Sequence, residues 1–121
     1  MDAQIEQALK TDTLIDITTY GKKTGNPSKI EIVFHNFDGT IYISGLPGKR
    51  DWYANLLASP QFIFHVKQSA TADITATATP ITDEATRRQV LTKVVAQWNR
   101  QAELEAFVQS SPLVSVQLDD A

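Results

Sequence analysis

The residues best suited to chemistry in this 121-residue chain are two adjacent cations, Lys49 and Arg50, within the stretch GLPGKRDWYANLLASP at positions 45–60. Glycines and a proline precede them, and a helix is predicted from Trp52 to about Ala58 with Asp51 as its N-cap. A helix N-terminus presents unpaired N–H groups and the positive end of a dipole, so cations placed just before it favour an anion site. The carboxylate of Asp51 would compete for those N–H groups, which leaves the two cations as the main anion ligands.

A second basic turn lies earlier in the chain, where the sequence reads GKKTG at positions 21–25. Gly21 and Gly25 flank the cations Lys22 and Lys23, and this turn could form a second wall of the same site. A solvated loop with ordinary surface cations also explains both basic stretches, and composition alone slightly favours it. Both readings stay open at this point.

Other side chains carry weaker signals of chemistry. His35 and His65 each lie on a predicted strand, opposite its main apolar face, and are expected at the surface or at a barrel end. Two histidines without cysteine or HExxH spacing do not indicate a metal site. Asp16 and Glu31 are isolated carboxylates on strands, so an acid pair of the glycosidase kind is not indicated.

Composition argues against several classes of function. The formal net charge of −3 does not suit a general nucleic-acid binder, which would carry a basic excess. No apolar run approaches the ~20 residues that cross a bilayer, and the polar segment Met1–Lys10 does not read as a signal peptide, so no integral membrane segment is expected. The absence of cysteine excludes disulfides and thiolate chemistry. A cytoplasmic location fits these features.

The elements that must position these residues follow from periodicity and turn signals. Strands with alternating apolar residues are predicted over 14–20, 29–35, 40–44, 61–67, 72–79 and 113–118. Helices are predicted over about 2–10, over 52–58 and within 82–109, where Asn99 indicates a break. The Asp38-Gly39 hairpin signal and the short connections favour antiparallel pairing. We therefore predict a single α+β domain over residues 1–121, in which a barrel of about six mainly antiparallel strands (14–79 and 113–118) carries flanking helices.

Two separated motifs resemble those of a known family. The stretch TTYGKKTGNP at positions 18–27, followed by KIEIVF at 29–34, resembles the TTxGRKSGxPRRIEIWF signature of the deazaflavin-dependent nitroreductase and quinone reductase family. The resemblance continues through DWYANLLA at 51–58 and through Pro80–Glu84, and it ends near Ser111–Val114. It covers nearly the whole chain in the right order, which makes it far more specific than a lone glycine pattern.

This resemblance implies a split β-barrel of the FMN-binding, flavin-reductase-like type. Family members transfer a hydride from reduced coenzyme F-420, or from FMN in related branches, to quinones, nitroaromatics or other small acceptors. Because the bound cofactor carries the hydride, the protein needs no general base, thiol or metal. Ser44 and Tyr42 are candidates for a proton donor, with solvent as a third. Carried over by motif position, the implied cofactor-binding residues are Gly21, Lys22, Lys23, Gly25, Ser44, Gly45, Gly48, Lys49, Arg50, Trp52, Tyr53 and Asn55.

The chain departs from the family pattern at positions that bear on the cofactor. Lys22, Lys23, Asn26 and Ser28 stand where arginine is preferred, and lysine lacks the bidentate fork of arginine. Val33 stands where tryptophan is common. The leading expectation is a small oxidoreductase that uses F-420 and a small-molecule electron acceptor. The alternatives are an FMN-dependent reductase on the same barrel and a non-catalytic binder of a hydrophobic or lipid-like ligand. By resemblance, both homodimers and monomers occur among such barrels.

Overall fold

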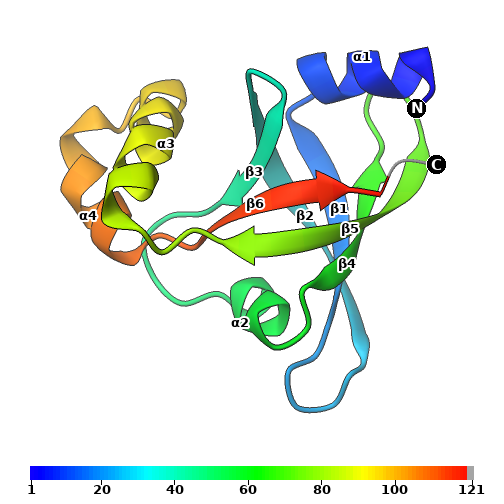
Figure 1. The fold of residues 1–121 in the computed structure, drawn as a ribbon, viewed down its shortest axis with the longest axis horizontal. Coiled ribbons are helices and arrows are strands. Elements are labelled where there is room, and N and C mark those ends of the chain that lie inside the picture. The colour runs from blue at the N-terminus through cyan, green and yellow to red at the C-terminus, as the bar shows by residue number, and fades with distance from the viewer. Residues whose placement is uncertain (120–121) are drawn as a thin grey trace.

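The computed structural model of the protein describes residues 1–119, which form a closed barrel of antiparallel strands in the order β1-β2-β3-β6-β5-β4 (Figure 1). The predicted α+β split barrel is thereby confirmed. The strands are β1 (Leu14–Tyr20), β2 (Pro27–Phe37), β3 (Thr40–Ser44), β4 (Gln61–Val66), β5 (Ala72–Pro80) and β6 (Leu113–Leu118). The helices are α1 (Ala3–Thr11), α2 (Asp51–Ala58), α3 (Glu84–Gln97), the 3-10 helix η1 (Gln101–Glu103) and α4 (Leu104–Ser110).

Alternate residues of each strand fill the interior of the barrel. β1 buries Ile15 and Ile17, while Asp16 between them faces outward. The small residues of β5 also face inward: Ala76 is buried opposite Phe62, its partner on β4. A small residue opposite a large ring lets the narrow barrel close without overpacking, which explains the low bulk of β5.

The β2–β3 hairpin gives the barrel its split. β2 extends two residues beyond its predicted limits at each end. Asp38 and Gly39 close the hairpin with φ angles of 56° and 90°, the positive values that a type I′ turn requires. β3 pairs with β2 only from Phe34 to Phe37, whereas β1 pairs with β2 from Pro27 to Val33. Within the described chain, the second edge of β2 over residues 27–33 therefore has no strand partner.

Two helices cover the ends of the barrel (Figure 1). α1, capped by Asp2, buries Ala8 and Leu9 against the barrel core at one end. α2 buries Trp52 and Leu56 against the same core at the other end, beside the β1–β2 turn. Within residues 1–119, none of these or the other helices is long and apolar enough to cross a membrane.

α3 and α4 form a helical pair beside the barrel, with a hydrophobic cluster of their own. Val94, Val95 and Phe107 are fully buried between the helices, and the cluster reaches Phe37 and Tyr42 on the outer face of the barrel. This second cluster covers strand residues that alternation alone would place in solvent.

The end of α3 is fixed by a defined stop signal. Asn99 has a φ of 56°, and the N–H of Arg100 reaches back to the carbonyl of Val95 at 2.8 Å, which closes the helix in the Schellman manner. The predicted break at Asn99 is thus confirmed. After this break, η1 occupies residues 101–103 and α4 begins at Leu104.

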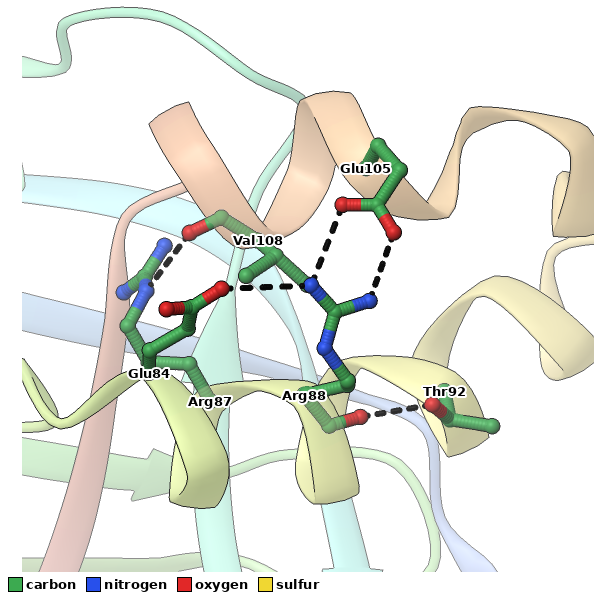
Figure 2. A network of polar contacts seen from close by, with 6 residues as sticks. All are labelled: Glu84, Arg87, Arg88, Thr92, Glu105 and Val108. Atoms are coloured by element: carbon green, nitrogen blue, oxygen red, sulfur yellow. Dashed lines mark hydrogen bonds and ion pairs between the residues drawn. The ribbon is translucent and has the colours of Figure 1, made fainter.

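Adjacent arginines on α3 fasten the helical pair in different ways (Figure 2). The guanidinium of Arg87 is partly buried and donates four hydrogen bonds, to the carbonyls of Ile81, Phe107, Val108 and Ser111, at 2.7–3.1 Å. Arg87 thereby supplies donors to carbonyl groups at the C-terminal end of α4, where the Phe107 carbonyl also accepts the N–H of Ser111.

Its neighbour Arg88 makes an exposed ion pair instead. Arg88 grips both carboxylate oxygens of Glu105 at 2.7 and 3.1 Å and also reaches Glu84 at 3.3 Å (Figure 2). These hydrogen bonds hold the pKa of the Glu105 carboxyl below its usual value. Glu105 remains exposed to solvent, so this ion pair links α3 to α4 at the surface.

We predict that Arg87→Ala lowers the free energy of unfolding by about 2–3 kcal/mol, because several carbonyls lose a charged donor. The measurement is urea unfolding followed by circular dichroism. Arg88→Ala is the matched control on the next residue and should cost clearly less, since exposed ion pairs contribute little. Equal losses in the two variants would contradict this account of how α4 is held.

Candidate functional site

A cleft of about 470 Å³ opens where the barrel is split. One side is the unpaired edge of β2, from Ile30 to Val33, and the other is the segment Ser44–Leu46 that follows β3. The cleft is completed by side chains from three further elements, namely Leu14, Arg50, Trp52 and Trp98. Its lining is thus mainly apolar and aromatic, and its charged residues are Glu31 and Arg50.

The unpaired edge of β2 is a ready surface for a flat polar ligand. In an antiparallel strand, alternate residues direct their N–H and C=O groups to each edge. Because β3 ends before it reaches residues 27–33 of β2, the groups on that edge have no strand to bond. A heterocycle with donors and acceptors along one side could pair with them while its faces contact the apolar walls.

Arg50 stands at the mouth of the cleft and at the start of α2. It occupies the N-cap position, with φ −138° and ψ 137°, and no side chain caps the helix. The prediction that Asp51 is the N-cap was wrong: the carbonyl of Arg50 already accepts the N–H of Ala54 at 3.1 Å, which makes Asp51 the first helical residue. The first N–H groups of α2 consequently remain available to an anion.

The guanidinium of Arg50 is held by its own loop. Nη1 donates to the carbonyl of Lys49 at 2.8 Å, and Nη2 donates to that of Leu46 at 3.2 Å. A guanidinium has five N–H donors, so further donors remain for a ligand. The Arg50 side chain therefore stabilises its loop and is also a candidate anion ligand in the cleft.

Lys49 turns out to line a different cavity from Arg50. This second cavity, of about 500 Å³, lies between the loop, α2 and the ends of α3 and α4, and its lining includes Gly48, Lys49, Tyr53 and Ser111. Gly48 has a φ of 127°, and its N–H donates to the carbonyl of Ser110 at 3.1 Å, which ties the loop to α4. The sequence treated the two cations as one clamp, whereas the structure separates them across the loop.

The basic β1–β2 turn is fastened to α2 by one side chain. Asn55 Oδ1 accepts the backbone N–H of Lys22 at 3.0 Å, and Asn55 Nδ2 donates to the hydroxyl of Thr19 at 3.1 Å. The turn itself is closed by the N–H of Gly25, which donates to the carbonyl of Gly21 at 2.8 Å. The structure thus brings the turn with Lys22 and Lys23 to the same end of the barrel as α2, although these lysines do not line the cleft.

The two candidate proton donors lie in different places. Ser44 is buried at the cleft, and its hydroxyl donates to the carbonyl of Pro112 at 2.8 Å. Tyr42 points to the outer face, where its ring lies 5.9 Å from that of Phe37 under the α3–α4 pair. Among the described residues that line the cleft, Ser44 is present and Tyr42 is not.

Trp98 is a cleft residue that the sequence analysis did not identify. It follows the last residue of α3, and its ring lies 5.4 Å from that of His35 and 6.1 Å from that of Phe107. An aromatic residue directly before the break at Asn99 was the available signal, because a helix end that leaves the core is where a side chain can reach a cleft.

His35 is not at the surface, so that prediction was wrong. It lies on the outer face of β2, as alternation requires, but α3 covers it and leaves only 2% of its surface exposed. Its Nδ1 lies 2.8 Å from Gln97 Oε1, whereas its Nε2 is buried without a hydrogen-bond partner. Burial lowers the pKa of His35, and the hydrogen bond to Gln97 opposes that shift.

The carboxylates expected to be isolated are in fact cross-strand neighbours. Asp16 on β1 pairs in register with Glu31 on β2, and Lys67 donates to both, at 2.7 Å to Asp16. These contacts lower the pKa of Asp16, chiefly through the hydrogen bond from Lys67. Two carboxylates bridged by one lysine form a structural ion-pair network rather than an acid–base pair.

His65 lies in a chain of polar contacts on the outer face. Its Nε2 is 2.7 Å from the hydroxyl of Thr18, and its Nδ1 is 2.7 Å from Asp73 Oδ1. The order hydroxyl–imidazole–carboxylate resembles a nucleophile triad. However, β1 and β4 are each paired on both edges, so their N–H groups near Thr18 serve the ladder and not an oxyanion. Within residues 1–119, no three His, Cys, Asp or Glu side chains cluster as a metal site would require.

Solved structures with the same architecture support the description of the fold. The heme storage protein HutZ from Vibrio cholerae is 15% identical, with a TM-score of 0.72 over 99% of this chain and 91% of its own. A conserved hypothetical protein from Mycobacterium tuberculosis is 14% identical, with a TM-score of 0.75 over 99% of this chain and 81% of its own. An F420 reductase is 15% identical, with a TM-score of 0.73 over 99% and 96% of the two chains. A search of curated proteins found no match.

A closed antiparallel barrel with one open strand edge beside a helix N-terminus defines this protein as a split β-barrel. Because their sequence identities to this chain are low, these structures support the fold and not the function. The family model of the F420H(2)-dependent quinone reductases, however, matches residues 1–118. The chain therefore belongs to the F420H(2)-dependent quinone reductase family, which is a family of oxidoreductases, and the resemblance seen in its motifs is confirmed.

We predict that Asn55→Ala loosens the β1–β2 turn, because the amide of Lys22 loses its acceptor and Thr19 loses a donor. Hydrogen exchange at the Lys22 amide should accelerate, with a loss of about 1 kcal/mol in unfolding free energy. Asn55→Asp is the matched control: it keeps an oxygen for Lys22 and should keep that amide protected. Unchanged exchange in Asn55→Ala would show that the turn is held by other contacts.

Proposed function

We propose that this protein transfers a hydride from reduced coenzyme F-420 to a quinone or a similar small acceptor, and that the split-barrel cleft is the cofactor site. The observation that carries this proposal is the conjunction of three features at one place: the unpaired edge of β2, the uncapped N-terminus of α2, and Arg50 at the cleft mouth. The membership of the chain in its family supports the same cofactor.

The residues of the cleft fit the chemical parts of this cofactor. Its tricyclic ring is flat and polar along one side, which suits the open edge of β2 between the apolar walls of Ile32 and Trp52. Its tail carries phosphate and carboxylate groups, which suit Arg50 and the free N–H groups of α2. Lys22 and Lys23 would add positive charge at the same end of the barrel. When bound, the reduced cofactor supplies the hydride.

The contribution of the protein is to bind, orient and exclude water. Trp52 is 7% exposed and belongs to the barrel core, so the wall it gives the cleft is rigid. The loop from Ser44 to Arg50 is fixed by the internal bonds of Arg50 and by the Gly48–Ser110 contact. Ser44 is the candidate for a proton donor within the cleft. Since its hydroxyl already donates to Pro112, solvent is the rival donor.

Other functions are compatible with the same cleft, and experiments distinguish them. FMN also combines a flat ring with a phosphate, so an FMN-dependent reductase would use the same cleft. Nitroaromatics are an alternative class of acceptor. The proposal includes a cytoplasmic location and a homodimer. A non-catalytic binder of a hydrophobic ligand would be indicated by a copurified acyl chain together with no binding of either cofactor.

We predict that Arg50→Gln weakens F-420 binding by more than about tenfold, because a charge-assisted contact to the tail is lost. The measurement is the dissociation constant from F-420 fluorescence, followed by oxidation of reduced F-420 on addition of menadione or a nitroaromatic. The same titration with FMN distinguishes the two cofactors.

Lys49→Gln is the matched control, because Lys49 lines the other cavity and should change the affinity clearly less. An equal loss in both variants would indicate a general charge effect instead of a site at Arg50. Failure of the wild-type protein to bind F-420 would contradict the proposed function.

A further inference from the structure

We propose that His35 is a positioning residue for the cleft: through Gln97 and Trp98 it holds the α3 side of the cleft in place only while its imidazole is neutral. The identity of the ligand that the cleft binds rests on the proposed function. The coupling between His35 and Trp98 does not depend on that ligand.

Trp98 connects the cleft to the buried cluster behind it. Trp98 lines the cleft, and its ring lies at centroid distances of 5.4 and 6.1 Å from those of His35 and Phe107. Its backbone N–H donates to the carbonyl of Val94 at 3.1 Å, and the left-handed residue Asn99 ends the helix immediately afterwards. A shift of the end of α3 would therefore move an indole that forms one wall of the cleft.

His35 is the contact that ties this end of α3 to the barrel. Gln97 Oε1 is an acceptor, so the Nδ1 atom of His35, 2.8 Å away, carries the proton of the neutral imidazole. The lone pair on Nε2 is then buried without a partner. The ring is packed between Phe37, at 5.5 Å and nearly parallel, and Trp98. The site thus accommodates neutral imidazole at the cost of one unsatisfied acceptor.

Protonation would make this arrangement unfavourable. It would place a positive charge and a second N–H donor on Nε2, where the structure offers no acceptor, at a residue that is 2% exposed. The aromatic faces of Phe37 and Trp98 would offset only part of that cost. The imidazolium would gain most by reaching water, and that requires the end of α3, with Gln97 and Trp98, to move away from β2.

The surrounding charges do not relieve this cost. On α3, the ammonium of Lys93 lies 5.4 Å from the centroid of the Phe37 ring and disfavours a second cation nearby. On β3, the ring of Tyr42 lies 5.9 Å from that of Phe37, and its phenol brings no carboxylate to His35. After α3, Arg100 is paired with Glu103 at 2.9 Å. None of these groups supplies a carboxylate to His35.

The direction of the pH effect follows from burial. Because burial lowers the pKa of His35 in the folded protein, an unfolded or displaced state takes up the proton first. The stabilisation that this contact provides is complete above the ordinary histidine pKa of about 6.5 and is lost progressively as the pH falls below it. The α3 wall of the cleft should therefore loosen on mild acidification.

The experiment uses the fluorescence of Trp98, since Trp52 and Trp98 are the only tryptophans of the chain. In a Trp52→Phe background without ligand, emission is recorded from about pH 8 to about pH 5, a window that brackets histidine titration. We expect a red shift of the emission on the acid side, with the far-ultraviolet circular dichroism unchanged. His35→Gln, which can still pair with Gln97 but does not titrate, should abolish the shift, and His35→Phe provides a second non-titrating variant.

The matched control is His65→Gln, because His65 lies on the outer face of β4 in contact with Thr18 and Asp73. It should retain the shift. A second measurement uses the protein with Trp52 present and compares the F-420 affinity at neutral and at acid pH. On acidification, the wild type should lose roughly fivefold or more in affinity relative to His35→Gln. This factor is the lower end of typical coupling between sites.

A shift that persists in both His35 variants, that disappears in His65→Gln, or that is absent from the parent protein would overturn the proposal. Because the emission is recorded without ligand, a failure to bind F-420 would count against the proposed function and would leave this result intact.

Discussion

The structure depends on a mismatch in strand length. β2 runs over Pro27–Phe37, whereas its neighbour β3 ends at Ser44 after pairing with only the last part of β2. A barrel must leave an edge open where such a mismatch occurs, since no other strand can fill the place. The chain leaves β3 at that point, crosses the gap with the loop 45–50 and enters α2. The cleft, the loop and the helix N-terminus are thus consequences of one constraint.

The loop 45–50 is a partition between two cavities as well as a connection. Arg50 folds back on the carbonyls of its own loop and lines the cleft, while Lys49 lines the cavity toward α4. Gly48 supports this partition, because its positive φ lets the backbone approach Ser110 closely. Adjacent residues of the same charge consequently meet different environments, and only one of them stands at the open edge of β2.

Much of the fold could be predicted from local patterns. The alternation of β1 and the Asp38-Gly39 turn depend on residues adjacent in sequence, so periodicity and turn chemistry sufficed. The N-cap of α2 was misplaced by one residue, because Asp51 is a good cap by type and only the observed hydrogen bond from Ala54 to Arg50 decides otherwise. Element limits of this kind depend on tertiary packing and not on propensity.

The parts of the site that escaped prediction all depend on contacts between distant segments. The local alternation predicts that His35 is exposed, whereas α3 covers it in the structure. Its partner Gln97 is 62 positions away in the sequence. The bridge from Lys67 to Asp16 and Glu31 needs the register of three strands, which no local pattern provides. The family motif includes cleft-lining residues such as Ser44 and Arg50, yet it does not include Trp98, which also lines the cleft.

The proposed cofactor site runs along the open edge of β2 and beside the N-terminus of α2. Nitrogen–proton correlation spectra of the labelled protein, recorded during titration with F-420, test this most directly. We expect the amide signals of Ile30–Val33, Gly45 and Asp51–Tyr53 to shift together and saturate at one stoichiometry, while those of α1 do not shift. Shifts confined to the residues around Ser110 and Arg87, with the edge of β2 unaffected, would contradict it.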